Sequence, residues 1–581
     1  MALKQVLTKL IYAMTRTKNI LCVTLQVSVC SVLMFSCTNK KSSAAFRSEL
    51  DSLNLLEGEI SLCGSDAADQ FGKVSFALSC SDSVQKNFDL ATALLHSFEY
   101  SEAEKTFAKV IAQDPDCLMA YWGVAMCNFH PLWEPPSQAN LKKGSRVIAL
   151  ARSVGGDKSS KAHDYLEAIA TIYDQWDSLD HATRVLKFEK ASAALYEKYP
   201  ADNEAAIFYA LALRAAADPA DKSFKKQKKA GEILEFLFQK EPNHPGIAHY
   251  IIHNYDYPEL ARLALPAARK YAAIASASAH AQHMPSHIFT RLGLWDEAIR
   301  SNKQSISSAQ CYAENAQMKG HWDEELHGLD YLVYAYLQKG DDANARQQVE
   351  YLKTINDVFP QNFKDAYCFA AMPARYALER RDWKSASQLS LGPANFPWEK
   401  FKWERAHINF ARLMGAIHLN DVETANGELK SLESIHQQLV DAKDNYKANL
   451  VNIQINIGKG WIKLAEGKSA EAIKLMNEAA NMEDLTEKHP VTPGELLPAR
   501  ELLGDMYMAM KQPAKALEAY QSDLNRHPNR FNGMYGAGLA AEKLGHKKEA
   551  ASYFDQLLAL GDSERPGMAD VEAFVKKHAT Q

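Results

Sequence analysis

The sequence contains none of the short motifs that mark the common hydrolases, redox proteins and nucleotide-binding enzymes. A Gly-x-Ser-x-Gly turn, a Cys-x-x-Cys pair and a Cys-x-x-Cys-His haem site are all absent. Gly467-Lys468-Ser469 has Ile462 where a phosphate-binding loop requires glycine. A zinc-protease helix is not predicted either, because Tyr250 rather than glutamate follows His249. We therefore expect a protein that works by binding.

The sequence also lacks low-complexity tracts, and no segment convincingly predicts a β-strand. Hydrophobic residues make up 47% of the chain and charged residues 24%, which is ordinary for a soluble folded protein. The formal net charge of −5 becomes more negative once a basic leader is removed, so nucleic acid is not an expected partner. At 581 residues the chain must divide into domains or stack as a solenoid.

Residues 1–36 are predicted to be a secretory leader. Basic residues without any acidic residue precede an apolar run from Ile20 to Phe35, and this run is shorter than the roughly 20 residues that span a bilayer. A serine before Cys37 and a polar tail after it resemble a bacterial lipoprotein cleavage box, although Met34 departs from the favoured leucine. We predict lipidation of Cys37 and a location in the bacterial cell envelope, at the outer membrane or in the periplasm. Release without a lipid is the alternative.

The envelope is a compartment that permits disulfide bonds. Cys63 and Cys80 lie in a non-repetitive arm at residues 37–85, and Cys117 ends the first predicted repeat. A bridge among these three cysteines would tie the arm to the helices that follow. Their spacing does not reveal which of them pair.

From residue 86 almost to the end the pattern is helical and recurs every 34 residues. Gly504 and Ala516, for example, reappear as Gly538 and Ala550. This period, with a small residue in one helix and an alanine twelve positions later, resembles the tetratricopeptide repeat, a pair of antiparallel helices that stacks into a superhelix. The matching pairs are Ala91 with Ala103, Ile252 with Ala264, Ser286 with Ala298, Val333 with Ala345, Leu413 with Ala425, Gly460 with Ala472, Gly504 with Ala516 and Gly538 with Ala550.

The resemblance implies an all-α fold, a solenoid of the tetratricopeptide type. A Gly-Pro to Pro-Trp break at residues 392–398 predicts two superhelical segments, residues 86–390 and residues 391–581. Short stretches such as residues 280–288 and 327–332 resemble a bacterial secreted subfamily of these repeat proteins, a likeness that implies no particular activity. Such repeats imply a protein or peptide partner bound in the concave groove.

Histidines follow the same repeat. His249 and His253 recur 34 residues later as His283 and His287, and the i, i+4 spacing places each pair on one helical face. The repeat template aims these four side chains, and His327 of the next unit, into the groove. Clustered imidazoles are typical ligands of Zn, Cu or Fe. The predicted metal ligands are His249, His253, His283, His287 and His327, with Asp256, His280 and Asp330 as further candidates.

Three other interpretations stay open at this point. The histidines could be hydrogen-bonded groove residues or contacts for a peptide, and Pro285 is expected to interrupt the helix that carries them. A metal-dependent enzyme is a second alternative, with Glu324 as its base. An accessory surface lipoprotein of a polysaccharide-utilisation system is the third, in which exposed tryptophans would stack on sugars. The candidate tryptophans are Trp133, Trp322, Trp398 and Trp403. The leading hypothesis is a lipid-anchored binding or scaffold module with a transition-metal site.

Overall fold

The computed structural model describes residues 43–61, 63, 70–132, 135–155, 157–561 and 563–578. The predicted leader, the lipidation site Cys37 and Trp133 lie outside these residues. The described part is helical almost throughout, which confirms the predicted all-α class. Its one pair of strands is two residues long, with β1 (His321–Trp322) parallel to β2 (Val358–Phe359). Among the helices described, none combines the length and apolar character that crossing a membrane requires.

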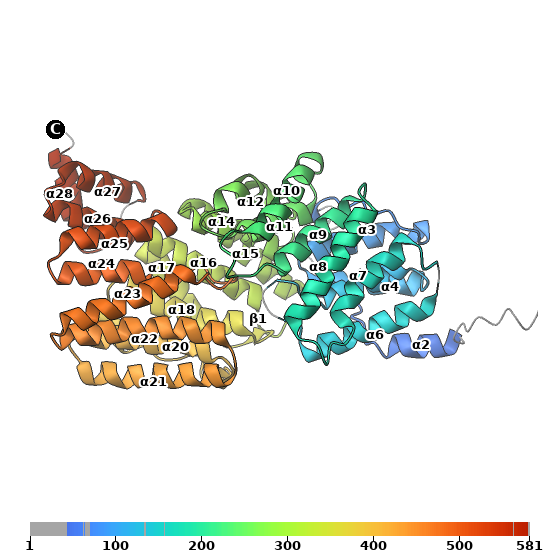
Figure 1. Ribbon diagram of the computed structural model, residues 1–581, viewed down its shortest axis with the longest axis horizontal. Helices are drawn as coiled ribbons and strands as arrows, with labels where there is room; N and C mark the ends of the chain where they lie inside the picture. The colour runs from blue at the N-terminus through green and yellow to red at the C-terminus, as the bar shows by residue number, and fades with distance from the viewer. Residues whose placement is uncertain are drawn as a thin grey trace, which may run out of the picture.

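Neighbouring helices pack against one another in chain order; the blue to green N-terminal helices occupy one end of the long axis and the yellow to red C-terminal helices the other, where the helices of residues 422–578 stack across that axis (Figure 1). The first set is α2 (Ser43–Asp51), η2 (Asp82–Val84), α3 (Gln85–His96), α4 (Tyr100–Gln113), α5 (Leu118–Cys127), α6 (Gln138–Val154), α7 (Lys161–Tyr173), α8 (His181–Lys198), α9 (Asn203–Ala215), α10 (Lys225–Lys240), α11 (Pro245–Tyr255), α12 (Ala261–Ile274), α13 (Ala279–His283), α14 (Pro285–Arg291) and α15 (Trp295–Asn315). The second set is α16 (Asp323–Lys339), α17 (Asp342–Leu352), α18 (Phe363–Glu379), α19 (Trp383–Ser387), η3 (Trp398–Lys400), α20 (Lys402–His418), α21 (Val422–Asp441), α22 (Asn445–Ala465), α23 (Ser469–Leu485), α24 (Ala499–Ala509), α25 (Pro513–Arg526), α26 (Phe531–Lys543), α27 (Lys547–Ala559) and α28 (Met568–His578).

Small residues lie where neighbouring helices cross, as the repeat template predicts. Every alanine that the template pairs with a preceding small or apolar residue is fully buried. A Cβ atom added at Gly504 would lie 2.6 Å from the Tyr520 ring, and one at Gly538 would lie 2.3 Å from the Phe554 ring. No larger side chain fits at these crossings, so the 34-residue register is confirmed.

The apolar interior forms successive clusters. One spans residues 53 to 335, a second residues 326 to 408 and a third residues 367 to 571. Helix α16 contributes to both of the first two clusters, which fits a solenoid whose units pack against their neighbours. The division of the superhelix at residue 391 stays a prediction.

A buried arginine joins the C-terminal repeats to the middle of the chain. The Arg530 guanidinium donates to Glu379 Oε1 at 2.8 Å, to Glu501 Oε2 at 3.0 Å and to the Tyr334 hydroxyl at 3.1 Å. These contacts connect the start of α26 with α16, α18 and α24, which are far apart in sequence. The superhelix therefore turns back on itself instead of leaving an open spiral.

Two disulfides attach the segment before α3 to the helices. Cys80 pairs with Cys117, with a Cα–Cα distance of 5.2 Å, so a bridge within the predicted group of three is present. Cys63 pairs instead with Cys311 of α15, 248 residues away and 5.9 Å between Cα atoms. The arm is thus fastened both to the first repeat and to the helix beside the histidine-bearing unit.

Candidate metal centre

Six buried histidines from three neighbouring repeats meet in the interior. Helix α11 carries His249 and His253, α13 and α14 carry His280, His283 and His287, and α16 carries His327. Pro285 divides α13 from α14, as expected from its missing N–H group. No member of the set is more than 8% exposed, so these side chains do not line an open groove. We call this set the histidine array.

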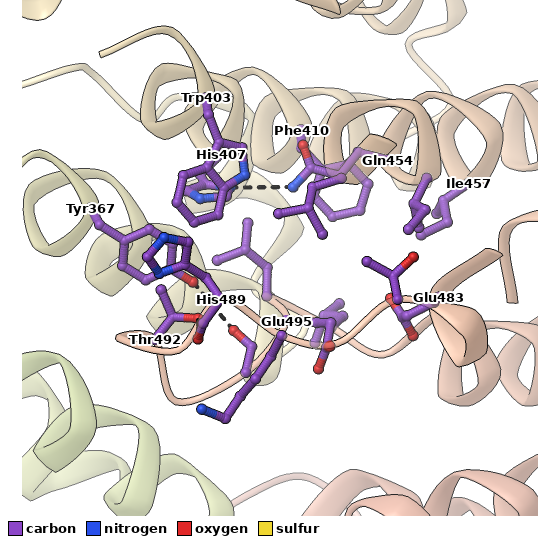
Figure 2. Close-up of a pocket in the computed structure, with 17 residues that line it drawn as sticks. Tyr367, Trp403, His407, Phe410, Gln454, Ile457, Glu483, His489, Thr492 and Glu495 are labelled. Atoms are coloured by element: carbon purple, nitrogen blue, oxygen red, sulfur yellow. Dashed lines mark hydrogen bonds between the residues drawn. The ribbon is translucent and has the colours of Figure 1, made fainter. Parts of the chain in front are cut away.

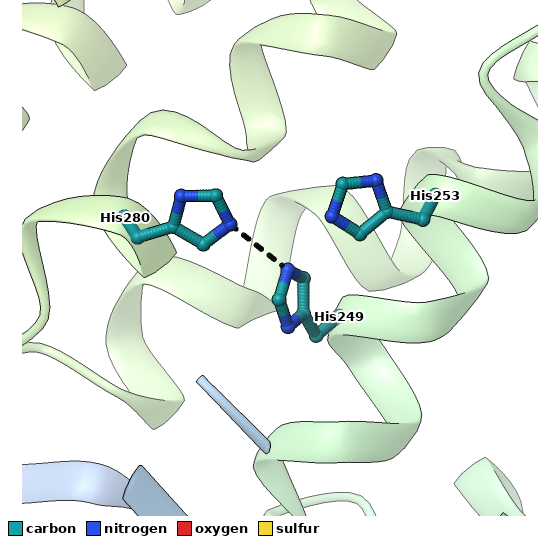
Figure 3. A group of neighbouring side chains, drawn as sticks. All are labelled: His249, His253 and His280. Carbon is teal, nitrogen blue, oxygen red and sulfur yellow. Dashed lines mark hydrogen bonds between the residues drawn. The ribbon is translucent and has the colours of Figure 1, made fainter. Parts of the chain in front are cut away.

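The histidine array consists of two groups of three. His249, His253 and His280 form the first trio, shown in Figure 3, and His283, His287 and His327 form the second trio. Within each trio, one ring nitrogen from every histidine lies within 4.8 Å of the others. Ring centroids of His253 and His287 are 6.2 Å apart, so the two trios are adjacent.

The hydrogen bonds around the second trio determine where its protons lie. His283 Nδ1 is 2.7 Å from Asn302 Oδ1, and the amide nitrogen of Asn302 donates to a backbone carbonyl, so Oδ1 accepts a proton from His283. His287 Nδ1 lies 3.0 Å from Asp256 Oδ2. Since both protons are on Nδ1, the two Nε2 atoms are unprotonated, yet they face each other at 3.1 Å. Two lone pairs at this distance repel unless a cation lies between or beside them.

The first trio repeats this arrangement. His249 Nδ1 donates to the His96 carbonyl at 2.6 Å, which leaves its Nε2 without a proton. That Nε2 lies 3.2 Å from His280 Nε2, the contact drawn dashed in Figure 3. His280 Nδ1 faces Glu324 Oε2 at 3.5 Å, so its other ring nitrogen, Nε2, is the one directed at His249. Ligand histidines in metalloproteins are oriented through Nδ1–H contacts of this kind.

Burial favours the neutral form of five imidazoles of the array. It lowers the pKa of His249, His253, His283 and His327 well below the usual 6.5. The pKa of His287 falls to about 4, because burial outweighs the opposing effect of Asp256. Neutral imidazole is the form that ligates a metal ion.

The three predicted carboxylate and histidine candidates have different surroundings. His280 belongs to the first trio. Asp256 holds His287 and is itself bound by Arg291 and Lys488, at 2.8 Å and 3.0 Å. Asp330 belongs to neither trio, and its carboxylate is paired with the buried Arg375 guanidinium. The array therefore brings together all the predicted histidines, while Asp256 orients His287 and Asp330 serves a separate ion pair.

A connecting segment covers the array and fills the inner face of the superhelix. Residues 486–498 run between α23 and α24 without regular structure, yet most of them are buried. Their carbonyls accept hydrogen bonds from inward side chains: Tyr331 donates to Thr492 at 2.9 Å, and Arg375 donates to Gly494 at 2.9 Å. We call residues 486–498 the crossing segment. A buried irregular backbone needs such partners, so the segment is built into the fold.

A small hollow remains on the other side of the crossing segment, beside α18, α20 and α22 (Figure 2). Its volume is about 50 Å³. Burial lowers the pKa of His407 and of His489, two of its lining residues, to about 3. His407 is engaged with Gln454 at 3.2 Å. This hollow is too small for a peptide.

A third cluster of possible ligand atoms was not predicted. His96, Glu204 and His244 are buried and equally close, but here the carboxylate lies between the two rings. Glu204 is 3.0 Å from His96 Nε2 and 2.9 Å from His244 Nε2, so both rings donate to it. His96 Nδ1 lies 3.0 Å from the Tyr250 hydroxyl. Protons occupy the nitrogens that a metal would need.

Residues that support the array also escaped the sequence analysis. Asn302, the His96 carbonyl and Lys488 orient or balance its members, and no repeat or motif in the sequence marks them. The tryptophans offered for sugar stacking do not support that use. Trp398 and Trp403 are buried, and Trp322 packs on Tyr312 with ring centroids 4.2 Å apart.

Comparison with known proteins identifies the repeats. Residues 501–565 match the family model described as tetratricopeptide repeat, which confirms the predicted repeats in this part of the chain. Repeats of this kind generally mediate protein–protein interactions. No curated protein matches the chain.

Two solved structures are similar to the chain at low sequence identity. A tetratricopeptide repeat protein from Parabacteroides merdae ATCC 43184 is 14% identical, with 51% of this chain and 97% of that one covered and a TM-score of 0.27. The human IFIT1 dimer with m7Gppp-AAAA is 13% identical, with 88% and 99% covered and a TM-score of 0.34. Both TM-scores are too low to carry a conclusion about this chain.

Proposed function

We propose, with the tetratricopeptide repeats of residues 501–565 as the premise, that this protein is an envelope binding protein whose histidine array holds transition-metal ions. The observation that carries the proposal is the 3.1 Å separation of His283 Nε2 and His287 Nε2, while both Nδ1 atoms face hydrogen-bond acceptors. A metal ion would turn this repulsion into coordination. Each trio supplies three imidazoles, a donor set that suits Zn, Cu or Fe.

The extracytoplasmic location has separate support. Two disulfides are typical of proteins that fold in an oxidising compartment. Together with the predicted leader and Cys37 they favour a lipid-anchored protein of the bacterial envelope, at the outer membrane or in the periplasm. The membrane contact would then be made by the lipid and not by the helical solenoid.

A protein partner follows from the repeat type. The crossing segment fills the inner face near the array, so a partner would contact the outer faces or the C-terminal repeats. Metal would act in this picture by fixing the geometry of α11, α13, α14 and α16, three successive units of the superhelix.

Metal analysis of purified protein tests the proposal. Protein expressed with its leader and prepared without chelator should contain one to two equivalents of Zn, Cu or Fe. Replacing His253 and His287 by Gln should remove most of the metal, because each trio loses a ligand. His244→Gln is the matched control, since His244 is equally buried but hydrogen-bonded to Glu204. Metal-free wild-type protein, or equal metal in the double variant and the control, would overturn the assignment.

A metal-dependent enzyme is the second candidate. Three histidines leave an open coordination position, as in catalytic zinc sites, and Glu324 lies beside His280. The array is also reached by a cavity, which a purely structural metal site does not need.

A further inference from the structure

A cavity of about 370 Å³ reaches the edge of the histidine array. It lies between the N-terminal helices and the crossing segment. Its wall includes His253 of the first trio and Asp256, which holds His287. This volume is within the range of small-molecule sites, roughly 300 to 1,000 Å³. A molecule in the cavity would therefore lie directly beside the array.

The cavity wall carries more positive than negative charge. Arg214, Arg291 and Lys488 are opposed only by Asp256 and Glu487 among the described residues that line it. Arg214 Nε donates to the His253 carbonyl at 2.9 Å, and no acceptor among the described residues is bound to its two terminal nitrogens. This guanidinium is held in place by a residue of the array and keeps its planar donor pair for a ligand.

One further polar atom in the wall lacks a partner. His181 Nδ1 is buried, and no hydrogen bond to it is present in the described structure. Buried polar atoms without partners are rare and costly, because each loses its bonds to water. The wall thus offers a guanidinium and a ring nitrogen to one occupant. Such an occupant carries an anionic group and also a hydrogen-bonding group.

Charge balance at the array points to the same ligand. Asp256 is already neutralised by Arg291 and Lys488. If the proposed function is right, a divalent ion bound by the neighbouring histidines would add positive charge that Asp256 does not compensate. Uncompensated charge in the interior is strongly unfavourable. An anion entering through the cavity would supply the missing negative charge.

We propose that this cavity binds a small carboxylate- or phosphate-bearing molecule, with its anionic group at Arg214 and its body beside His253. The expected coupling between anion and metal binding rests on the proposed function, whereas anion binding in the cavity does not. Binding of metal and anion should be mutually favourable, because each offsets the charge of the other.

Calorimetric titration of the full-length protein tests this, with succinate and inorganic phosphate as separate probes. At least one probe should bind to wild type, and Arg214→Gln should weaken that binding at least tenfold. Arg269→Gln, which removes an exposed arginine paired with Glu297, is the matched control and should bind as wild type does. The stronger of the two probes shows whether the site prefers carboxylate or phosphate.

Each titration is repeated after chelation and after reloading with Zn. Tighter anion binding in the loaded protein supports both the metal and the cavity. Arg214-dependent binding in a protein that takes up no metal supports the cavity and overturns the metal site. Equal binding by wild type and Arg214→Gln, or no binding of either probe at millimolar concentration to folded protein, overturns the cavity proposal.

Discussion

The histidine array and the His96–Glu204–His244 cluster are both buried, both polar and equally compact, but their protons lie in different places. In the cluster, Glu204 accepts a proton from each imidazole, so every close contact is a hydrogen bond. In the array, outer acceptors such as Asn302 and Asp256 take the Nδ1 protons, and the inner Nε2 atoms are left facing one another. Closeness of ligand atoms alone therefore does not define a metal site. The acceptors that hydrogen-bond to the other ring nitrogen of each histidine determine whether the inner nitrogen is available to a metal.

Removal of Glu204 should give the largest effect on stability. Glu204→Ala leaves His96 and His244 buried without their common acceptor, so we expect a loss of about 3 to 5 kcal/mol in the free energy of unfolding. Urea unfolding of the chelated protein measures it. Metal content of the folded protein should stay at the wild-type level. A parallel loss of metal would mean that the cluster, too, is a metal site.

Removal of Asn302 tests the histidine array instead of the His96–Glu204–His244 cluster. Asn302→Leu deletes the acceptor that holds the His283 proton on Nδ1, and metal affinity should fall by roughly 10- to 100-fold. Competition with a fluorescent zinc chelator measures the affinity. Asn302→Asp keeps an acceptor at the same place and should retain most of the metal affinity. Equal affinities in the two variants would show that the proton position does not matter.

The C-terminal repeats offer a region with neither histidine set. Ala516→Leu would overpack the crossing of α24 and α25, at a cost of about 1 to 3 kcal/mol. Circular dichroism during urea unfolding should show this loss with unchanged metal content, because a solenoid transmits stability mainly between neighbours. Glu518→Leu, on the exposed side of the same helix, should change stability little. Similar losses in both variants would contradict the assigned repeat register.

His527 in these repeats differs from the array histidines in its charge. Burial lowers its pKa, but Asp523 and Glu495 outweigh burial and raise it to about 10. Because the folded-state pKa exceeds the unfolded value of 6.5, the stabilisation is complete below pH 6.5 and is lost as pH rises toward 10. The side chain is 15% exposed, so we expect a loss on the order of 1 kcal/mol between pH 6 and pH 9. His527→Gln should remove this slope from the urea-unfolding data, and an unchanged slope would assign it to other groups.

Local regularities in the sequence were enough to predict the repeats and most of the histidine array. Residues at a spacing of 34 occupy equivalent positions in successive units, so the buried alanines and the shared face of His249 and His253 could be derived from periodicity. The interruption at Pro285 followed from a missing N–H group. These are properties of the chain over one or two helices.

The burial of the array could not be derived in the same way. The repeat template predicts which side chains line the concave surface. It contains no information about a later segment that packs on this surface. Residues 486–498 have no counterpart in the repeat pattern, so the sequence predicted groove-lining histidines where the structure has interior ones. The pairing of Cys63 with Cys311 escaped prediction for the same reason, since 248 residues separate them.

The sequence by itself determined the helical repeat, its register and the face on which the histidines stand, because these depend on side-chain size and spacing within a helix. Only the tertiary structure decided what those histidines can do. In the folded protein Asp330 pairs with Arg375, and Asn302 and Asp256 accept hydrogen bonds from the second trio. A cavity lined by cationic side chains lies beside the first trio. Proton positions and charge balance depend on partners contributed by distant helices, and no local pattern encodes which of those helices will meet.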